Sequence, residues 1–185
     1  MSRNLPDYRF RIAWDKLGPW LAEQAVALVG AGSHTFDGEI IYVSYDPRTD
    51  AKFFNWVTTW LSRQPGIMVE CRDRKPKAPP KCPSCHALIA KCPHCKQPIR
   101  ATQEKGVDTL IATDMIRLAW EGAYDLAVLA TSDRDLIPAV EFLNLKGRKV
   151  IHAGIPPKGA DLARACWASF DVAARAKEIE RPSGP

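Results

Sequence analysis

The chain alternates between two spacings of hydrophobic residues, one typical of helices and one typical of strands. Apolar residues at helical spacing predict helices over 14–29, 51–62, 107–121, 135–146 and 159–167. Short runs rich in apolar and β-branched residues predict strands over 39–45, 67–71, 126–130 and 149–153. Strands and helices therefore alternate along most of the chain, and no internal repeat is apparent.

This alternation predicts an α/β fold with a parallel, doubly wound sheet flanked by helices. The run 126–130, Leu-Ala-Val-Leu-Ala, is wholly apolar, which is typical of a strand covered on both faces. In such a sheet the ligand site lies beyond the carboxyl ends of the strands. Residues that directly follow a strand are therefore the first candidates for chemistry.

Residues 72–103 interrupt the pattern, because they are rich in proline and have little apolar periodicity. We interpret them as an insertion into a domain that spans 1–175, followed by a polar, flexible tail over 176–185. From Arg72 to Lys105 there are nine Lys and Arg residues, opposed only by Asp73 and Glu104. This segment carries +7 and the rest of the chain −2, against a net charge of +5. Such a basic segment indicates a polyanion partner, nucleic acid first, and the alternative is a loop that its lysines keep solvated.

The remaining composition is that of a globular protein. The chain has 185 residues, of which 46% are hydrophobic and 25% charged, enough for one well-packed domain. No apolar run approaches the roughly 20 residues that span a bilayer, and no signal-peptide pattern is visible. We therefore expect a soluble, cytoplasmic protein without a membrane partner, whose six cysteines are metal ligands or buried thiols rather than disulfides. The oligomeric state stays open, a homodimer included.

Four of the cysteines form two Cys-x-x-Cys pairs, Cys82 with Cys85 and Cys92 with Cys95. Two such pairs supply the four thiolates of a tetrahedral zinc site, and a closed thiolate shell indicates a structural metal. A redox pair or unrelated cysteines are the alternatives. The insertion is too short for a core of its own, so zinc would supply its folding energy.

The residues around the zinc pairs fall into two groups. Three lysines flank the pairs, where they offset the thiolate charge and can hold a nucleic-acid backbone: Lys81, Lys91 and Lys96. His86 and His94 are competing ligands or simply exposed, and Cys71 and Cys166 are interpreted as small buried residues.

A second constellation is acidic. Asp133 and Asp135 follow the apolar strand 126–130 directly, where a parallel α/β sheet places its site. The alternative is helix capping, with Ser132 and Asp135 in a capping box and Pro138 in the first helical turn.

The predicted helix 107–121 adds two carboxylates to this constellation. Asp114 lies within the apolar stripe of the helix, and Asp108 lies at its edge in the first turn. A carboxylate that faces a core is costly unless it is paired or bound to a metal. Four clustered carboxylates with few histidines favour Mg²⁺ or Mn²⁺ over zinc.

These residues resemble the NYN domain family, and in particular its LabA-like bacterial branch within the PIN-like nucleases. The resemblance rests on Glu104-Lys105-Gly106-Val107-Asp108, on Asp114 and on the run 130–138, which occur in order and on the expected elements. The element order, the run Lys146–Val150 and the cysteine-bearing insertion before the Lys-Gly-Val-Asp motif extend it over most of the chain.

The resemblance implies a Rossmann-like (PIN-like) sheet and metal-dependent ribonuclease chemistry. The family's acidic positions carry over to Asp108, Asp133 and Asp135, with Asp114 as a fourth, and these would hold Mg²⁺ or Mn²⁺. Lys105 and Arg134 are candidates for phosphate contacts. The chain departs from the family in one respect, because the family's first strand ends in Asp-Gly-x-Asn and no such motif occurs here. Asn4-Leu5 is a candidate remnant of it, and Asp7 and Asp15 are poor substitutes for its aspartate.

Three functions remain open at this point. The first is a metal-dependent ribonuclease, or a nuclease acting on single-stranded nucleic acid, with Trp56, Trp60 and Trp120 either stacking on bases or forming core. The second, favoured by the missing Asp-Gly-x-Asn motif, is a non-catalytic RNA-binding or adaptor module of the same fold. The third is a phosphatase-like hydrolase that uses Asp133 and Asp135. A nicotinamide or flavin role is disfavoured, because no Gly-x-Gly-x-x-Gly follows a strand.

Overall fold

The computed structural model describes residues 12–30 and 32–181. They form two compact units, which we describe one at a time. The first unit contains the described residues up to Glu39, residues Gln64–Met68 and the chain from Asp108 onward. The second contains Ile40–Arg63 and Val69–Val107. Asn4, Leu5 and Asp7, named above in connection with the first strand of the family, lie outside the described residues, and Asp15 lies in the first turn of helix α1 (Trp14–Val29).

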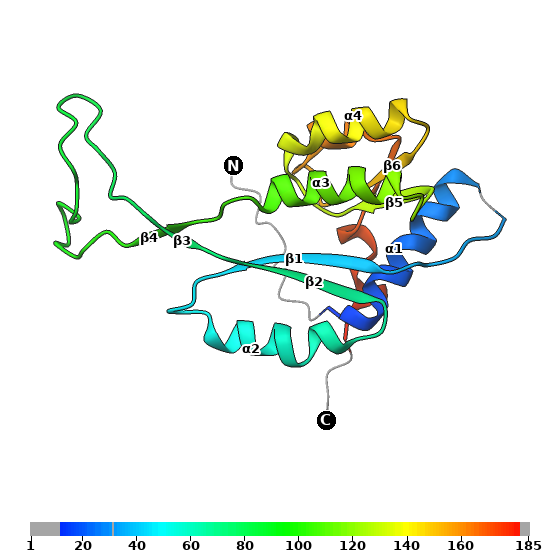
Figure 1. Cartoon of the computed structure of the whole chain (residues 1–185), viewed down its shortest axis with the longest axis horizontal. Helices are drawn as coiled ribbons and strands as arrows, with labels where there is room; N and C mark the ends of the chain where they lie inside the picture. Colours follow the sequence, from blue (N-terminus) through cyan, green and yellow to red (C-terminus); the bar gives the residue numbers. More distant parts are fainter. Residues whose placement is uncertain (1–11, 31, 182–185) are drawn as a thin grey trace. The chain divides into compact units, whose positions relative to one another are not determined.

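The first unit is built on a three-stranded parallel sheet in the order β5-β6-β7, of which β5 and β6 are labelled in Figure 1. The strands are β5 (Leu126–Leu129), β6 (Lys149–Gly154) and β7 (Ala168–Asp171). Leu126 pairs with Lys149, and Ile151 pairs with Ala168, so all three strands end at the same edge of the sheet. The sheet is therefore of the predicted parallel type.

Helices cover both faces of this sheet, as expected for a doubly wound fold. On one face α3 (Val107–Trp120), α4 (Ile137–Leu145) and α5 (Ala160–Ala165) enclose a core with strands β5 and β6. Its buried members are Met115, Leu129, Leu136, Val140, Leu143, Val150, Leu162 and Cys166. On the other face lie α1 and the 3₁₀ segment η3 (Ala173–Ile179). Trp20 and Leu21 of α1 and Ile179 of η3 form a second buried cluster with Ala153 of β6. The adjacent β5 residues Leu129 and Val128 pack into the first and the second of these cores, respectively. Strand β5 is wholly apolar because both of its faces are covered.

The end of the chain differs from the predicted flexible tail. Ile179 is 1% exposed, and its carbonyl accepts a hydrogen bond of 2.9 Å from the backbone N–H of Ala13. The Trp20 indole N–H donates to Glu178 at 2.8 Å and packs edge-on against Phe170. Residues through 180 are therefore part of the first unit because they complete the core beneath α1, and residues 182–185 lie outside the described residues.

The second unit contains most of a strand–helix–strand arrangement, whose two strands begin in residues assigned to the first unit, and a long arm (residues 78–100). Strands β1 (Glu39–Tyr45) and β2 (Ile67–Asp73) form one small sheet, linked by α2 (Ala51–Thr59) and the 3₁₀ turn η1 (Leu61–Arg63). At the beginning of the two strands, the Glu39 N–H donates to the carbonyl of Gly66. At their ends, the Arg74 N–H donates to the carbonyl of Tyr45, so the two strands run in the same direction. Strands β3 (Lys75–Lys77) and β4 (Ala101–Gln103) pair antiparallel at the base of the arm.

The described strands fall into three sheets. The strands described form the pairs β1-β2 and β3-β4 and the triplet β5-β6-β7. Parallel pairing within β5-β6-β7, with helices on both faces, confirms the predicted parallel α/β class. Within the described part of the chain, none of the helices is both long and apolar enough to cross a membrane.

Two of the predicted helices are shortened because 3₁₀ turns take the place of one end. The helix expected over 51–62 ends at Thr59 and is followed by η1. The Thr58 and Thr59 hydroxyls donate to carbonyls of Phe54 and Asn55 in this last turn, a local bond that competes with regular helix geometry. The helix expected from Asp135 begins at Ile137, after the 3₁₀ turn η2 (Arg134–Leu136).

Glu39 makes the stability of the first unit depend on pH. A Cβ added to Gly18 of α1 would lie 2.8 Å from the Glu39 carboxyl, so the two are closely packed. Burial raises the pKa of Glu39 from 4.5 to about 7. The folded form therefore holds its proton more tightly, and this contribution to stability is complete below pH 4.5 and is lost as the pH rises through 7.

We expect Glu39→Gln to flatten the pH dependence of the free energy of unfolding. Because the Glu39 carboxyl is only half-buried and water screens it, the difference from wild type should grow by about 1 kcal/mol between about pH 5 and pH 8. Urea denaturation of both proteins across this range measures it. The same decline in the two proteins would contradict the assignment.

Candidate functional site

The acidic site is built on the loop that leaves β5. Asp133 is extended and caps the turn η2, and its Oδ1 accepts a hydrogen bond of 2.9 Å from the backbone N–H of Asp135. The Thr131 hydroxyl accepts from the N–H of Asp133 at 3.2 Å. Capping therefore does occur here, but through Asp133 rather than the predicted Ser132, because the 3₁₀ turn precedes α4. Pro138 stands in the first turn of α4, as predicted.

The backbone of this loop is held in place from β6. His152 is 2% exposed, and its Nε2 donates to the carbonyl of Thr131 at 2.7 Å. Gly159, with φ +73°, lies close to both His152 and Ser132. A Cβ added there would be 3.1 Å from the His152 ring and 3.1 Å from the Cα of Ser132. The loop that carries Asp133 is thus packed between β6 and the start of α5. Sequence reasoning missed His152, since its partner lies 21 residues away along the chain.

Helix α3 places the other two aspartates in the same unit. Ile111, Ala112 and Met115 pack into the core that also holds Leu129 and Leu136, which flank the Asp133 loop. Asp108 lies one turn before these residues and is exposed. The Asp114 side chain is only 13% exposed and pairs with Arg117 at 3.2 Å, so its charge is balanced along the helix.

The donor chemistry of these residues suits a hard divalent cation, because carboxylate oxygens are the ligands that Mg²⁺ and Mn²⁺ prefer. The described residues place no group of three or more His, Cys, Asp or Glu side chains where they could hold one ion. Asp133 and Asp135 are brought together on one turn. A shared ligand set with Asp108 and Asp114 remains a prediction.

The arm of the second unit contains a tandem repeat, so the expectation of a chain without repeats is wrong for this segment. Lys-Cys-Pro-Ser-Cys-His-Ala-Leu-Ile-Ala at 81–90 is followed by Lys-Cys-Pro-His-Cys-Lys-Gln-Pro-Ile-Arg at 91–100. The hydrogen bonds repeat with the same ten-residue step. The backbone N–H of Cys82 donates to the carbonyl of Ala87, and the Cys82 carbonyl accepts from the N–H of His86, both at 2.9 Å. Cys92 makes the same two bonds with Gln97 and Lys96. The bridges Lys81↔Leu88 and Lys91↔Pro98 repeat in the same way.

Each repeat is a turn that favours the thiolate form of its first cysteine. Backbone N–H groups of Cys85 and Ser84 lower the pKa of Cys82, and those of Cys95 and His94 lower the pKa of Cys92. His86 and Lys96 occupy equivalent positions with positive φ, where each turn closes. Both Cys-x-x-Cys segments therefore form equivalent turns, but the described residues do not join the four cysteines into one metal-binding group, and the zinc site stays a prediction.

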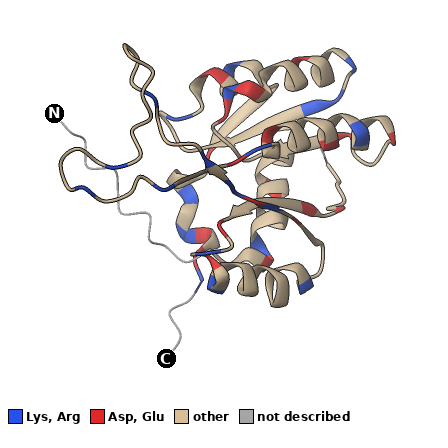
Figure 2. Cartoon of the chain, turned by 60° about the vertical axis from the view of Figure 1, so that its left-hand side comes forward, with Lys and Arg blue, Asp and Glu red and all other residues tan. Residues whose placement is uncertain are grey.

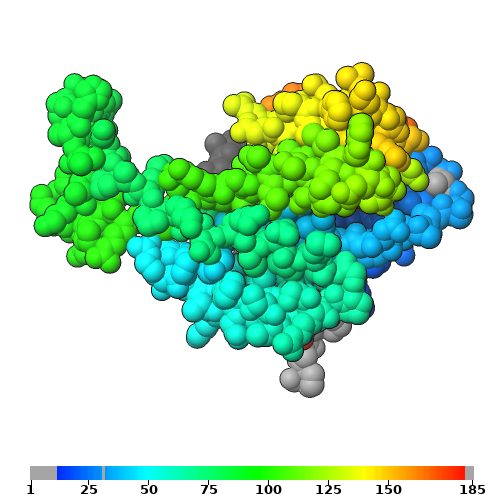
Figure 3. Space-filling model, in the orientation of Figure 1, coloured from blue at the N-terminus to red at the C-terminus, as the bar shows by residue number. Residues whose placement is uncertain are grey.

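The basic residues predicted to contact nucleic acid are at the surface. Lys81, Lys91 and Lys96 are exposed along the arm, which extends from β3 and β4 away from the rest of its unit (Figures 2 and 3). Lys105, just after β4, is exposed in the second unit, and Arg134 is exposed in the first. Cys166 is buried as predicted, and burial raises its pKa to about 11, whereas Cys71 is half-buried.

The aromatic residues considered for stacking lie in different settings. Trp56 and Trp60 stack on each other with ring centroids 5.6 Å apart, and Trp60 is 36% exposed. Trp120, at the end of α3, is 90% exposed. None of the three belongs to the buried cores of the described residues.

A polar network that the sequence did not suggest lies where β1 and β2 end. The Arg74 guanidinium donates to Thr102 at 3.0 Å and to Ser44 at 3.1 Å and pairs with Glu104 at 3.6 Å. Arg48 binds the carboxylate of Asp46, and this hydrogen bonding lowers the pKa of Asp46 to about 2. Arg74 thus links the end of β1 to β4, whereas the Arg48–Asp46 pair lies within the turn that follows β1.

The parallel α/β unit carries aspartates after strand β5 and at the start of helix α3, an arrangement that fits a PIN-like fold. The sequence model of the NYN domain matches residues 36–171, well over half of the chain. The chain therefore belongs to the NYN domain family, which is part of the PIN-like nuclease superfamily. All four aspartates and the cysteine arm lie within the match, whereas α1 precedes it. No curated protein and no solved structure matched the chain.

Proposed function

We propose that this protein is a metal-dependent ribonuclease that hydrolyses phosphodiester bonds in RNA or other single-stranded nucleic acid. The observation that carries the proposal is the NYN match, which includes the Asp133 loop at the end of β5 and the start of α3. The superfamily supplies the nuclease class. RNA as the substrate and membership of the LabA-like branch rest on the motifs of the chain, Lys105 to Asp108 and Thr131 to Asp135.

In this proposal Asp108, Asp133 and Asp135 hold Mg²⁺ or Mn²⁺, with Asp114 as a fourth carboxylate. A divalent ion bound there would lower the pKa of a water molecule and neutralise charge on the scissile phosphate. His152 positions the loop through the Thr131 carbonyl, and the Asp135 N–H fixes one oxygen of Asp133. Asp114 is balanced by Arg117, so its contribution is weaker than that of the loop pair.

The arm would serve as the RNA-holding element, organised by one structural zinc ion on Cys82, Cys85, Cys92 and Cys95. Support comes from the two equivalent turns with their thiolate-stabilising N–H groups. The basic residues of the arm would contact the phosphate backbone, which makes binding strongly dependent on salt.

Cleavage of end-labelled single-stranded RNA tests the activity directly. We expect products with added Mn²⁺ and none in buffer freed of divalent ions. Cleavage that persists without divalent ions would overturn the metal-dependent mechanism.

A second candidate is a non-catalytic RNA-binding module of the same fold. The feature that favours it is that the family's Asp-Gly-x-Asn motif does not occur in the sequence. RNA binding without cleavage at any Mn²⁺ or Mg²⁺ concentration would establish this alternative.

A further inference from the structure

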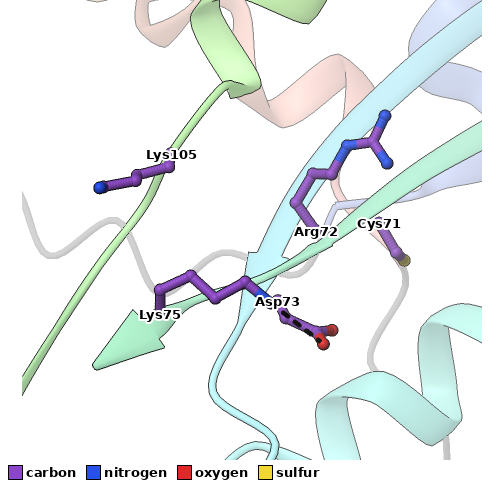
Figure 4. A pocket seen from close by; sticks show the side chains of 5 residues that line it. All are labelled: Cys71, Arg72, Asp73, Lys75 and Lys105. Carbon is purple, nitrogen blue, oxygen red and sulfur yellow. Dashed lines mark ion pairs between the residues drawn. The ribbon is translucent and has the colours of Figure 1, made fainter.

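A pocket of about 310 Å³ lies in the second unit where β2 ends (Figure 4). It is lined by Cys71, Arg72, Asp73, Lys75 and Lys105. The carboxyl end of a strand in a parallel pair is the usual place for a ligand in α/β proteins. The pairing of Lys75 with Gln103 brings β2 and Lys105 to one place, although the 81–100 repeats separate them in sequence.

The pocket is positively charged, because three cations and one carboxylate line it. Burial is the main cause of a raised pKa at Cys71, so this thiol adds no negative charge near neutral pH. Asp73 interacts with two other groups, a hydrogen bond with Tyr45 and a contact of 3.9 Å with Lys75. Arg72 lies 3.9 Å from Glu70, which is the outer limit of an ion pair.

The pocket cations contrast with Arg74, which lies between them in sequence. Arg74 donates two hydrogen bonds of about 3 Å and pairs with Glu104, so it holds the structure together. Arg72, Lys75 and Lys105 are exposed and have no comparable set of bonds among the described residues. Their charges are therefore available to a ligand.

The three cations are spread around the pocket rather than aimed at one point. Figure 4 shows Lys75 reaching back toward Asp73, with Lys105 and Arg72 extending outward on either side. Such spacing suits several phosphates along a chain better than one compact anion. The basic residues continue from Lys75 to Lys77 on β3 and to Lys81 at the base of the first repeat.

We infer that this pocket binds consecutive phosphates of a single-stranded RNA backbone and guides the strand between the β2 end and the arm. The inference rests on the proposed function for the identity of the polyanion. Arg72, Lys75 and Lys105 contact phosphate oxygens, and the flexible lysines adapt to the sugar-phosphate backbone without reading bases.

Binding of a fluorescein-labelled oligo(U) of about 12 nucleotides tests the pocket without cleavage. Anisotropy is measured in Asp133→Asn protein, without added divalent ions, over a range of KCl concentrations. We expect Lys75→Gln/Lys105→Gln to weaken binding about 10-fold at low salt and to reduce the slope of log K against log[salt] by about 1.4, roughly 0.7 for each lost contact. Lys52→Gln/Arg63→Gln removes two exposed charges of the same unit outside the pocket and should leave the slope unchanged.

The inference is overturned if the pocket variant keeps the wild-type slope of log K against log[salt], or if RNA binding is weakened only in Lys81→Gln/Lys91→Gln. It is also overturned if millimolar inorganic phosphate displaces the RNA fully, because that would indicate a site for one compact anion. Circular dichroism confirms that each variant is folded. Because binding is measured without cleavage, a selective loss in the pocket variant supports the pocket even if the wild type cuts no RNA. Conversely, cleavage by wild type with unaltered binding by the pocket variant would remove the inference and leave the nuclease in place.

Discussion

Asp133→Asn should abolish Mn²⁺-dependent cleavage of single-stranded RNA while leaving the fold intact. The asparagine Oδ1 can still accept the N–H of Asp135, so the cap of η2 is retained. What is lost is the negative charge that a divalent cation requires. Changing a residue that merely supports a metal ligand commonly costs 10- to 100-fold, so removal of a ligand should cost at least about 100-fold in rate. Initial rates at saturating Mn²⁺ measure the effect.

Asp161→Asn is the matched control for this experiment. Asp161 is an exposed carboxylate on α5 in the same unit, paired with Arg164 one turn away, and it lies outside the acidic loop. Its replacement should leave the cleavage rate within about twofold of wild type and the melting temperature nearly unchanged. Comparable rates for Asp133→Asn and wild type would move the catalytic site away from this loop.

The alternation of strands and helices was enough to predict the layered core of the first unit, because two cores bury both faces of β5. Val128 faces the α1 side and Leu129 the α3 side, so neither position tolerates a polar residue. Strand β7 was missed for the opposite reason. It is short, pairs only with β6, and alternates half-buried and exposed residues around Phe170, which leaves little signal in the sequence.

The parts of the candidate site that directly follow a strand could be predicted from the sequence. The parts that depend on pairing between strands far apart in the sequence could not. Asp133 and Asp135 follow β5 within six residues and were identified from that position alone. The support from His152 comes from the neighbouring strand. The basic pocket needs β3 and β4 to pair across both cysteine repeats before Lys105 comes near Arg72. Neither arrangement has a local sequence pattern.

The second large effect should come from the cysteine arm. We expect the purified protein to carry about one zinc per chain, and Cys82→Ser and Cys92→Ser each to lose it. The N–H groups that stabilise a thiolate at these positions would then surround a neutral hydroxyl, which is a poor zinc ligand. In the arm, Ile89 and Ile99 are only half-buried, so little apolar packing remains to hold residues 80–100 together once the metal is gone. Elemental analysis gives the zinc content, and limited proteolysis should show new cuts within the arm.

Two substitutions separate loss of a zinc ligand from general damage to the arm. Ser84→Ala changes an exposed residue inside the first Cys-x-x-Cys turn, and Cys71→Ser removes a thiol outside both turns. Both should keep the wild-type zinc content and protease resistance. Equal zinc content in Cys82→Ser and wild type would rule out the four-cysteine site. Loss of zinc with an unaltered cutting pattern would instead show that the backbone bonds of the two repeats, such as Ile89 N–H to the Pro80 carbonyl, hold the arm without metal.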